Sequence, residues 1–264
     1  MDYNYFHAQK ANRHKRVRGR TVLVIGCNTG GDCRYFVDLG AKEVHGVDVV
    51  DGIGRDFPHP TVTYHQESAE AMSLPSGYFD LVYSVATMEH VPDIFRAFSE
   101  MARVVKPGGV VYSLAAPLWN SRHGHHYPQY FVNYPWAHLR LSRDEAVRYL
   151  EENSVAIAEA NGTIQDVVAY MLDARNFNMR PSTDYIAATA RLPDLKVKVN
   201  MLDREPRGAI PPEVLDELAA KGYDEADLRA ITHCFIAKKR KPWRLFWVEL
   251  SNAAVARSPL ARQP

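Results

Sequence analysis

Histidines are concentrated in one stretch of this chain. His123, His125 and His126 are near neighbours and His138 follows shortly after them, whereas His90 stands well before this group. An imidazole with its ordinary pKa of about 6.5 can take a proton from an oxygen nucleophile at neutral pH. We therefore predict that His90, His125 and His126 are catalytic residues.

The same histidines could instead bind a metal ion or only shape their loop. A metal site built from imidazoles usually needs three or four ligands with oriented hydrogen-bond partners, and a fourth ligand is not evident here. Cys27, Cys33 and Cys234 are too scattered for a zinc site or a disulfide framework. We predict no metal site and, from the few cysteines, a reducing cytoplasmic location.

A second group of residues could hold a nucleotide-like ligand. Residues 21–25 form a continuous aliphatic and β-branched run, which is typical of a strand buried in a parallel sheet. The glycine-rich residues 26–31 follow, where Gly lets the backbone turn sharply and approach a ligand. Asn28 tolerates a left-handed backbone better than most other residues. This stretch predicts a tight turn at a ligand pocket.

A carboxylate follows the turn at the sequence spacing found in nucleotide-binding folds. Residues 32–39 predict a helix and residues 43–47 a second strand that ends in Asp48. Asp48 lies 18 residues beyond Gly30, close to the roughly 20 expected for a carboxylate that accepts bonds from ribose hydroxyls. This spacing fits a dinucleotide or an adenosine-type cofactor, or a sheet whose glycines serve only the turn. Asn28 stands where the dinucleotide fingerprint needs glycine, which disfavours a dinucleotide.

Several motifs in order resemble the class I S-adenosylmethionine-dependent methyltransferases that act on small molecules. They are residues 24–30 (VIGCNTG), Val47-Asp48, Ser68-Ala69-Glu70 to Leu74-Pro75, residues 79–84 (FDLVYS), residues 89–93 (EHVPD) and residues 105–109 (VKPGG). The resemblance covers residues 21–117. It implies a methyltransferase that converts S-adenosylmethionine to S-adenosylhomocysteine. It also implies that His90 can line the cofactor pocket without acid-base work.

The resemblance also implies which residues bind the cofactor. They are Gly26, Cys27, Asn28, Gly30, Asp48, Val49, Ser68, Ala69, Glu70, Ser84 and Val85. Two positions depart from the family pattern. Val24 replaces an acid that often supports the amino end of the cofactor, and Ser68 replaces an Asp that accepts the adenine amino group in many relatives.

The elements that position these residues predict an α/β fold. Alternating strands and helices up to residue 115 indicate a doubly wound, mostly parallel sheet, whose ligands bind beyond the carboxyl ends of the strands. The resemblance implies a seven-stranded Rossmann-like sheet with an inserted helical lid and an antiparallel edge strand. The further expected elements are a helix over 93–105 ended by residues 107–109, strands over 110–115, 195–202 and 230–237, and helices over 142–153, 163–175 and 211–220.

We predict one methyltransferase domain over residues 21–240, with residues 116–192 as a substrate-facing insertion and lid. Its aromatic residues form either a wall for the acceptor or a small separate core. The predicted substrate-binding residues are Tyr127, Tyr130, Trp136 and His138. The histidines favour an oxygen acceptor in a sugar, glycan precursor or secondary metabolite. N- or C-methylation, a nicotinamide-dependent oxidoreductase and a non-catalytic nucleoside-binding module are the alternatives.

Composition and the chain ends complete the sequence-based expectations. The 264 residues are 46% hydrophobic with a net charge of +1, which gives no reason to expect nucleic acid as the partner. Residues 1–20 are expected to form a helical segment that covers the pocket. The tail 241–264 pairs basic with aromatic residues, so it could contact a membrane surface, although packing on the domain or on a second subunit as a homodimer is favoured. We find no apolar run of bilayer length and no signal sequence.

Overall fold

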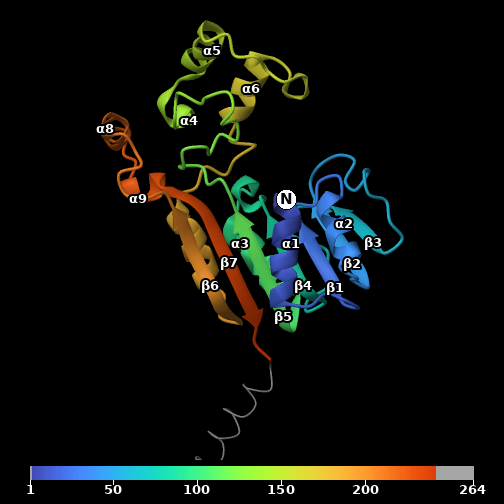
Figure 1. Cartoon of the computed structure of the whole chain (residues 1–264). Helices are drawn as coiled ribbons and strands as arrows, with labels where there is room; N and C mark the ends of the chain where they lie inside the picture. Colours follow the sequence, from blue (N-terminus) through green and yellow to red (C-terminus); the bar gives the residue numbers. More distant parts are fainter. Residues whose placement is uncertain (1, 242–264) are drawn as a thin grey trace, which may run out of the picture.

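The computed structural model of the chain describes residues 2–241. Its centre is one seven-stranded sheet with the strand order β3-β2-β1-β4-β5-β7-β6 (Figure 1). Every pairing from β3 to β5 is parallel, whereas β7 runs antiparallel to both of its neighbours, β5 and β6. The predicted architecture, including the antiparallel pairing at the edge, is confirmed.

The central strands are the most deeply buried. The strands are β1 (Thr21–Ile25), β2 (Glu43–Asp48), β3 (Val62–Gln66), β4 (Phe79–Val85), β5 (Val105–Ala115), β6 (Leu195–Arg204) and β7 (Ala230–Lys239). All residues of β1 and β4 are buried, because helices cover both faces of a parallel sheet. This burial explains the uninterrupted aliphatic runs in the sequence.

One predicted boundary is wrong. Residues 107–109 were expected to end a helix before a strand, but they lie inside β5, which already pairs through Val105 with Phe79. The register shifts between Phe79 and Leu81, and such an irregularity lets a strand accommodate a proline that cannot donate to the ladder.

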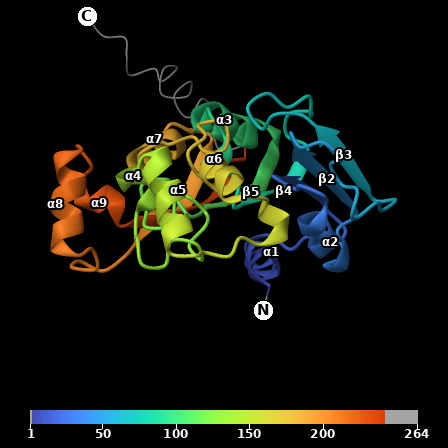
Figure 2. The same cartoon turned by 90° about the horizontal axis from the view of Figure 1, so that it is seen from above.

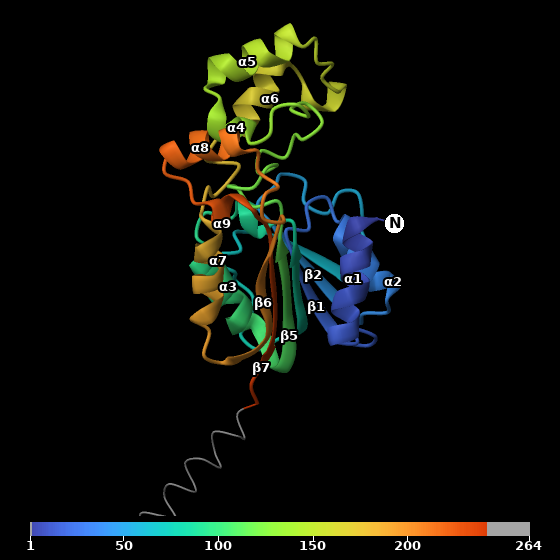
Figure 3. The ribbon, with the colours of Figure 1, turned by 60° about the vertical axis from the view of Figure 1, so that its left-hand side comes forward.

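Two helical layers sandwich the sheet (Figure 3). Helices α1 (Tyr3–His14) and α2 (Gly31–Asp38) cover one face, and α3 (Ile94–Val104) and α7 (Ser182–Ala190) cover the other. The apolar residues of α3 recur at helical spacing, and Ile94, Ala97, Phe98 and Met101 are all buried. The helix expected over 93–105 is therefore present.

The inserted part of the chain stands beyond the carboxyl ends of the parallel strands (Figure 1). In the view from above, α8 and α9 lie at the end of the molecule opposite β3 (Figure 2). It holds α4 (Ala137–Arg140), α5 (Arg143–Glu152), η2 (Glu159–Asn161) and α6 (Ile164–Met171), joined by α8 (Pro212–Ala220) and α9 (Glu225–Leu228). Capping boxes at Ser142 and Thr163 start α5 and α6, as the sequence predicts. Since α7 packs on α3, the inserted layer ends before residue 182.

The N-terminal helix forms as the sequence predicts and packs on the sheet, while its cover over the pocket stays a prediction. The ring of His7 hydrogen-bonds the Tyr112 hydroxyl at 2.7 Å, and Ala8 and Ala11 are fully buried on the sheet. The helix thus belongs to the sheet's helical layer. Residues 242–264 of the predicted tail lie outside the described residues.

No helix within residues 2–241 is long and apolar enough to cross a bilayer.

Candidate active site

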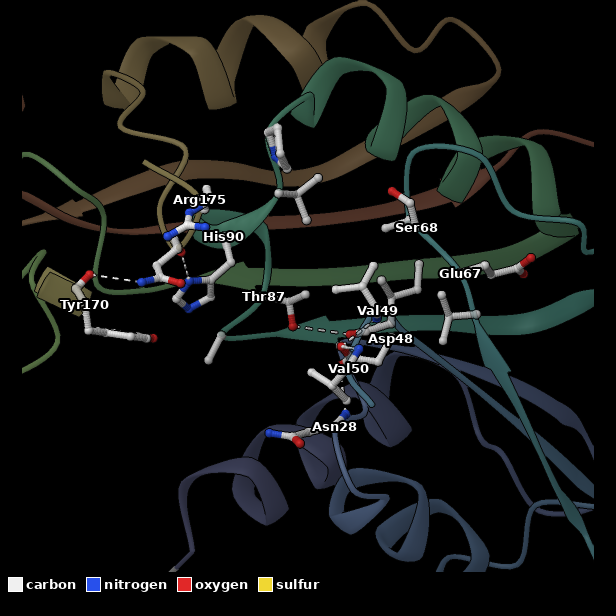
Figure 4. A pocket seen from close by; sticks show the side chains of 18 residues that line it. Asn28, Asp48, Val49, Val50, Glu67, Ser68, Thr87, His90, Tyr170 and Arg175 are labelled. Atoms are coloured by element: carbon white, nitrogen blue, oxygen red, sulfur yellow. Dashed lines mark hydrogen bonds between the residues drawn. The ribbon is translucent and has the colours of Figure 1, made fainter. Parts of the chain in front are cut away.

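A cavity of about 420 Å³ lies at the carboxyl ends of β1, β2 and β4. Figure 4 shows Asn28 and Asp48 on one side of it and His90 and Tyr170 on the other. The residues that line the cavity are Ile25, Gly26, Asn28, Val47, Asp48, Val49, Val50, Glu67, Ser68, Ala69, Ala86, Thr87, His90, Val91, Pro92, Tyr170, Arg175 and Asn176. Its size suits a small-molecule ligand.

The Asp48 carboxylate is fixed by backbone donors. Its Oδ2 accepts from the Asn28 amide at 2.8 Å, and its Oδ1 accepts from the amides of Val49 at 2.8 Å and Val50 at 3.2 Å. A carboxylate offers about four acceptor positions, so capacity remains for ligand hydroxyls. Asn28 adopts the predicted left-handed conformation with φ of 48°, which aims its amide at Asp48.

Gly26 is required where the turn meets the loop after β4. Its φ is +78°, and a Cβ at this position would collide with the side chain of Thr87. The Thr87 hydroxyl is anchored to the carbonyl oxygens of Val85 at 3.1 Å and Ile25 at 3.3 Å. The glycine therefore lets two cavity-lining loops come into contact.

The loop after β3 forms another wall. Ser68 and Ala69 line the cavity, as expected for cofactor contacts. Glu70 does not line it. The Glu70 carboxylate accepts from the Ser68 hydroxyl at 3.1 Å and from the backbone amide of Asp93, just before α3. Glu70 thus holds the loop in place rather than facing a ligand.

Four other predicted cofactor residues lie behind the cavity wall. Cys27 is buried against Gly46, and Gly30 backs onto Tyr64. Ser84 and Val85 are buried within β4, and the Ser84 hydroxyl has no hydrogen-bond partner within residues 2–241. Cys27 and Gly30 belong to the turn between β1 and α2, whereas Ser84 and Val85 point to opposite faces of β4, and none of the four lines the cavity.

His90 lines the cavity opposite Asp48. It belongs to η1 (Met88–His90), and its Nδ1 donates to the Asn176 carbonyl at 2.6 Å. This bond leaves Nε2 as the nitrogen with a free lone pair. Burial lowers the pKa of His90, so the ring is neutral at physiological pH.

A second histidine from the inserted layer meets His90. The ring centroids of His126 and His90 are 5.0 Å apart, and His126 stacks on Phe177 at 4.9 Å. Burial lowers the pKa of His126 to about 4. One ligand atom from each of Glu89, His90 and His126 lies within 4.8 Å of the other two. We call these three residues the Glu89 cluster.

Glu89 is the residue that the sequence analysis missed. Only 2% of it is exposed, and neither carboxylate oxygen has a hydrogen-bond partner in the described part of the chain. Burial raises the pKa of Glu89 to about 8, against the opposing effect of nearby backbone N–H groups, including that of Ala116. The motif that contains Glu89 was recognised, but a buried glutamate beside a distant histidine has no sequence signal.

The remaining candidates lie inside the inserted layer and do not line the cavity. Nδ1 of His125 accepts from the Tyr127 amide at 3.1 Å, and burial lowers the pKa of His125 to about 2. His138 donates through Nε2 to the Trp119 carbonyl at 2.6 Å, and burial lowers its pKa to about 3. These contacts give both rings a structural role.

The aromatic residues of the insertion form small cores. Trp136 is fully buried and donates to the Asn120 carbonyl, while Tyr130 is 5% exposed and accepts from Asn161. Tyr127 packs at the edge of the core that contains Tyr130. Of the two interpretations offered for these aromatic residues, a small separate core fits their burial better than a wall that contacts the acceptor.

The structure adds further residues to the cavity wall. Thr87, Tyr170, Arg175 and Asn176 line it, and the last three come from the end of the inserted layer. The sequence predicted a helix through residue 175, but α6 ends at Met171. Asp173 then accepts from the Arg175 amide at 2.8 Å, and this local turn brings residues 175 and 176 to the pocket.

Comparisons with known proteins agree with this geometry. Residues 23–113 match the family model described as a methyltransferase domain. The chain is 32% identical over 140 residues to the 2-methyl-6-phytyl-1,4-hydroquinone methyltransferase of Synechocystis sp., covering 51% of this chain and 43% of that protein. It is 30% identical over 160 residues to the ubiquinone biosynthesis O-methyltransferase of Bradyrhizobium sp., covering 55% and 62%. The chain thus spans about half the length of the curated relatives it matches.

Solved structures share the fold. An S-adenosylmethionine-dependent methyltransferase from Mesorhizobium loti superposes with a TM-score of 0.53 at 20% identity, covering 88% of this chain and 98% of that one. The phosphoethanolamine N-methyltransferase 2 of Haemonchus contortus, solved in complex with S-adenosyl-L-methionine, gives 0.51 at 17% identity, covering 89% and 53%. Residues 23–113 thus carry a methyltransferase domain, and the chain shares the fold of class I methyltransferases. The predicted class is confirmed, and the comparisons support S-adenosylmethionine as the cofactor.

Proposed function

We propose that this protein transfers a methyl group from S-adenosylmethionine to an oxygen of a small molecule. The observation that carries the proposal is the Asp48 carboxylate, held by three backbone amides at the wall of a cavity at the strand ends. In a doubly wound sheet this is the place where a ribose binds. Ser68 and Ala69 then face the adenine side of the cofactor.

Methyl transfer from a sulfonium is an in-line displacement, so the protein has to hold the nucleophile, the methyl group and the sulfur in line. An oxygen nucleophile must also lose its proton. We propose that the acceptor hydroxyl binds at the His90 side of the cavity, next to the Glu89 cluster. His125 is set aside as the base because its buried ring does not line the cavity and its Nδ1 already accepts from the Tyr127 amide.

The nature of the acceptor is the finer part of the proposal. A hydroquinone methyltransferase and a ubiquinone biosynthesis O-methyltransferase are among the relatives, which favours hydroxylated small molecules. We include hydroxylated aromatic compounds beside the sugars, glycan precursors and secondary metabolites expected from the sequence. We also propose a reducing, cytoplasmic location, which the three free cysteines support.

The test is a transfer assay. The protein is incubated with S-adenosylmethionine labelled at the methyl group and with panels of hydroxylated aromatics, sugars and amines. We expect labelled product with a hydroxylated acceptor, accompanied by S-adenosylhomocysteine. Transfer to amines alone would contradict the oxygen acceptor, while the absence of S-adenosylhomocysteine with every panel would contradict the methyltransferase activity.

A further inference from the structure

The Glu89 cluster is unusual because its polar atoms lack partners. Both oxygens of Glu89 and the Nδ1 atom of His126 are buried without a hydrogen bond among the residues that the structure describes. Within residues 2–241 no lysine or arginine forms an ion pair with Glu89. A buried carboxyl group with no cation and no hydrogen bond of good geometry is unfavourable, and a positively charged ligand would stabilise its charged form.

The spacing of the cluster suits one ion. Its three ligand atoms lie within 4.8 Å of one another. Two ligands of a tetrahedral zinc-sized ion, each bonded at about 2.1 Å, stand about 3.4 Å apart. The three side chains must therefore approach one another by up to about 1.4 Å to bind an ion at the centre, a shift within the reach of side-chain rotation.

The hydrogen bond of His90 is the kind that metal ligands make. A metal-bound imidazole usually donates its other ring N–H to a carbonyl or carboxylate, which fixes its tautomer and orientation. The Nδ1 of His90 donates to the Asn176 carbonyl at 2.6 Å, which leaves Nε2 free to coordinate. Phe177 packs against both histidine rings, with centroid distances of 5.4 Å and 4.9 Å, and shields this side of the cluster.

The backbone of His126 is also held in an uncommon state. Its φ is +64°, a left-handed conformation that is rare for a residue with a side chain. Residues kept in such conformations concentrate at functional sites, where the surrounding structure compensates for the strain. The ring of His126, which belongs to the inserted layer, lies beside His90 of η1.

We propose that Glu89, His90 and His126 bind one divalent transition-metal ion that holds and activates the acceptor. Two imidazoles and one carboxylate suit zinc, iron or manganese and leave coordination positions open. Of the three ligands His90 lines the cavity, so the ion would bind beside the place proposed for the acceptor. The role of the ion in transfer rests on the proposed function, whereas the binding of the ion does not.

The chemistry of the step balances without another reactant. The acceptor hydroxyl releases its proton to solvent when its oxygen binds the ion, because a divalent cation lowers the pKa of a bound hydroxyl. A lone pair of that oxygen then forms the bond to the methyl carbon. The carbon–sulfur bond breaks and its electron pair stays on sulfur, so the sulfonium becomes a thioether.

The test measures metal binding directly. Tag-free full-length protein, cleared of metal with a chelator, is titrated with Co²⁺ and followed by visible absorption. We expect one equivalent of ion to produce a ligand-field spectrum, and Glu89→Gln and His126→Ala each to weaken the binding by at least tenfold. His123→Ala is the matched control, because this exposed histidine in the same loop lies outside the cluster and should leave the titration unchanged.

Two outcomes would overturn the proposal. One is the absence of a saturable spectral change in the wild-type protein, and the other is wild-type Co²⁺ affinity in both Glu89→Gln and His126→Ala. S-adenosylhomocysteine binding by each variant confirms that it is folded. If the protein binds the cofactor but not Co²⁺, the metal site is contradicted and the proposed methyl transfer is not. If it binds Co²⁺ but not the cofactor, the proposed methyl transfer is contradicted and the metal site is not.

Discussion

At the scale of single residues, Asp48 decides whether the cavity can hold a ribose. Its charge strengthens every bond that it accepts, including those from ligand hydroxyls. Asp48→Asn keeps the shape but removes the charge, and we expect a loss of about 1.5 to 3 kcal/mol in cofactor binding, which is a factor of roughly 10 to 150. Asp51→Asn is the control, because this exposed carboxylate contacts only Gln66 among the described residues. Calorimetric titration with S-adenosylhomocysteine measures both, and equal affinities would contradict the assigned role.

Gly26 supports a second prediction at this scale. Any side chain there would have a left-handed backbone and would also strike Thr87. Gly19 has a similar φ of +71°, but no other residue of the described chain lies within 4 Å of an added Cβ. Gly19→Ala should therefore cost only the 1 to 2 kcal/mol or so of a left-handed residue. Gly26→Ala should cost more in urea unfolding and should lose cofactor binding, while comparable stability of the two variants would refute the steric argument.

The sequence predicted part of the site for a physical reason. Gly26, Asn28 and Asp48 lie close together in the chain and belong to consecutive elements of the fold. Their spacing in the sequence is therefore enough to predict that they meet at one pocket. Glu89 and His126 meet only because the inserted layer folds back over η1. Nothing in local periodicity records such a contact, which is why the metal site could not be predicted.

At the scale of elements, residues 176–180 clamp the inserted layer to the segment after β4. The Asn178 side-chain amide donates to the carbonyl oxygens of Met88 at 2.8 Å and Val91 at 3.1 Å, and its Oδ1 accepts from the Tyr185 hydroxyl at 3.2 Å. Asn178→Ala leaves these acceptors unpaired, so we expect a loss of about 2 to 3 kcal/mol of unfolding free energy. The control is Asn133→Ala, an exposed loop residue whose side chain makes no hydrogen bond among the described residues, and it should lose less than about 0.5 kcal/mol in the same urea titrations. Equal losses would mean that the hydrogen bonds of Asn178 do not contribute to the free energy of unfolding.

The junction of α1 and α2 should make stability depend on pH. Burial raises the pKa of Asp32 to about 6, although its carboxylate accepts from Asn4 at 3.0 Å. Because the folded-state pKa lies above the ordinary value of 3.8, the stabilising effect of protonation is complete below pH 3.8 and is lost as pH rises through 6.

The variant Asp32→Asn tests this junction. The wild-type protein should lose about 1.4 kcal/mol of stability between pH 5 and pH 8 that Asp32→Asn does not lose. The measurement is the free energy of urea unfolding of both proteins at each pH. A difference between the two proteins that stays constant across this range would show that Asp32 titrates normally.

Element prediction succeeded where burial is strong and failed where it is weak. The hydrophobic runs that form β1 and β4 are buried throughout, and the sequence predicts both strands. The strand β3 was missed because it lies at the sheet edge, where its residues are only partly buried or exposed and leave no hydrophobic pattern. The helix α7 has many alanines and threonines, and its place beside α3 depends on contacts with distant parts of the chain.

At the scale of the whole molecule, the architecture places chemistry at one edge of the sheet. The turn after β1, the carboxylate after β2 and the histidine after β4 converge there because parallel strands present their carboxyl ends together. The inserted layer supplies the remaining wall through Tyr170, Arg175 and Asn176. The sequence predicted the fold and this edge, whereas the path of the insertion had to be seen in the structure.

The most direct test of the central claim is a calorimetric comparison of S-adenosylhomocysteine with NAD, using the wild-type protein and Asp48→Asn. We predict that the wild-type protein binds one S-adenosylhomocysteine per chain, that Asp48→Asn binds it at least tenfold more weakly, and that NAD gives no heat of binding. Saturable binding of NAD, with no response to S-adenosylhomocysteine, would contradict the account.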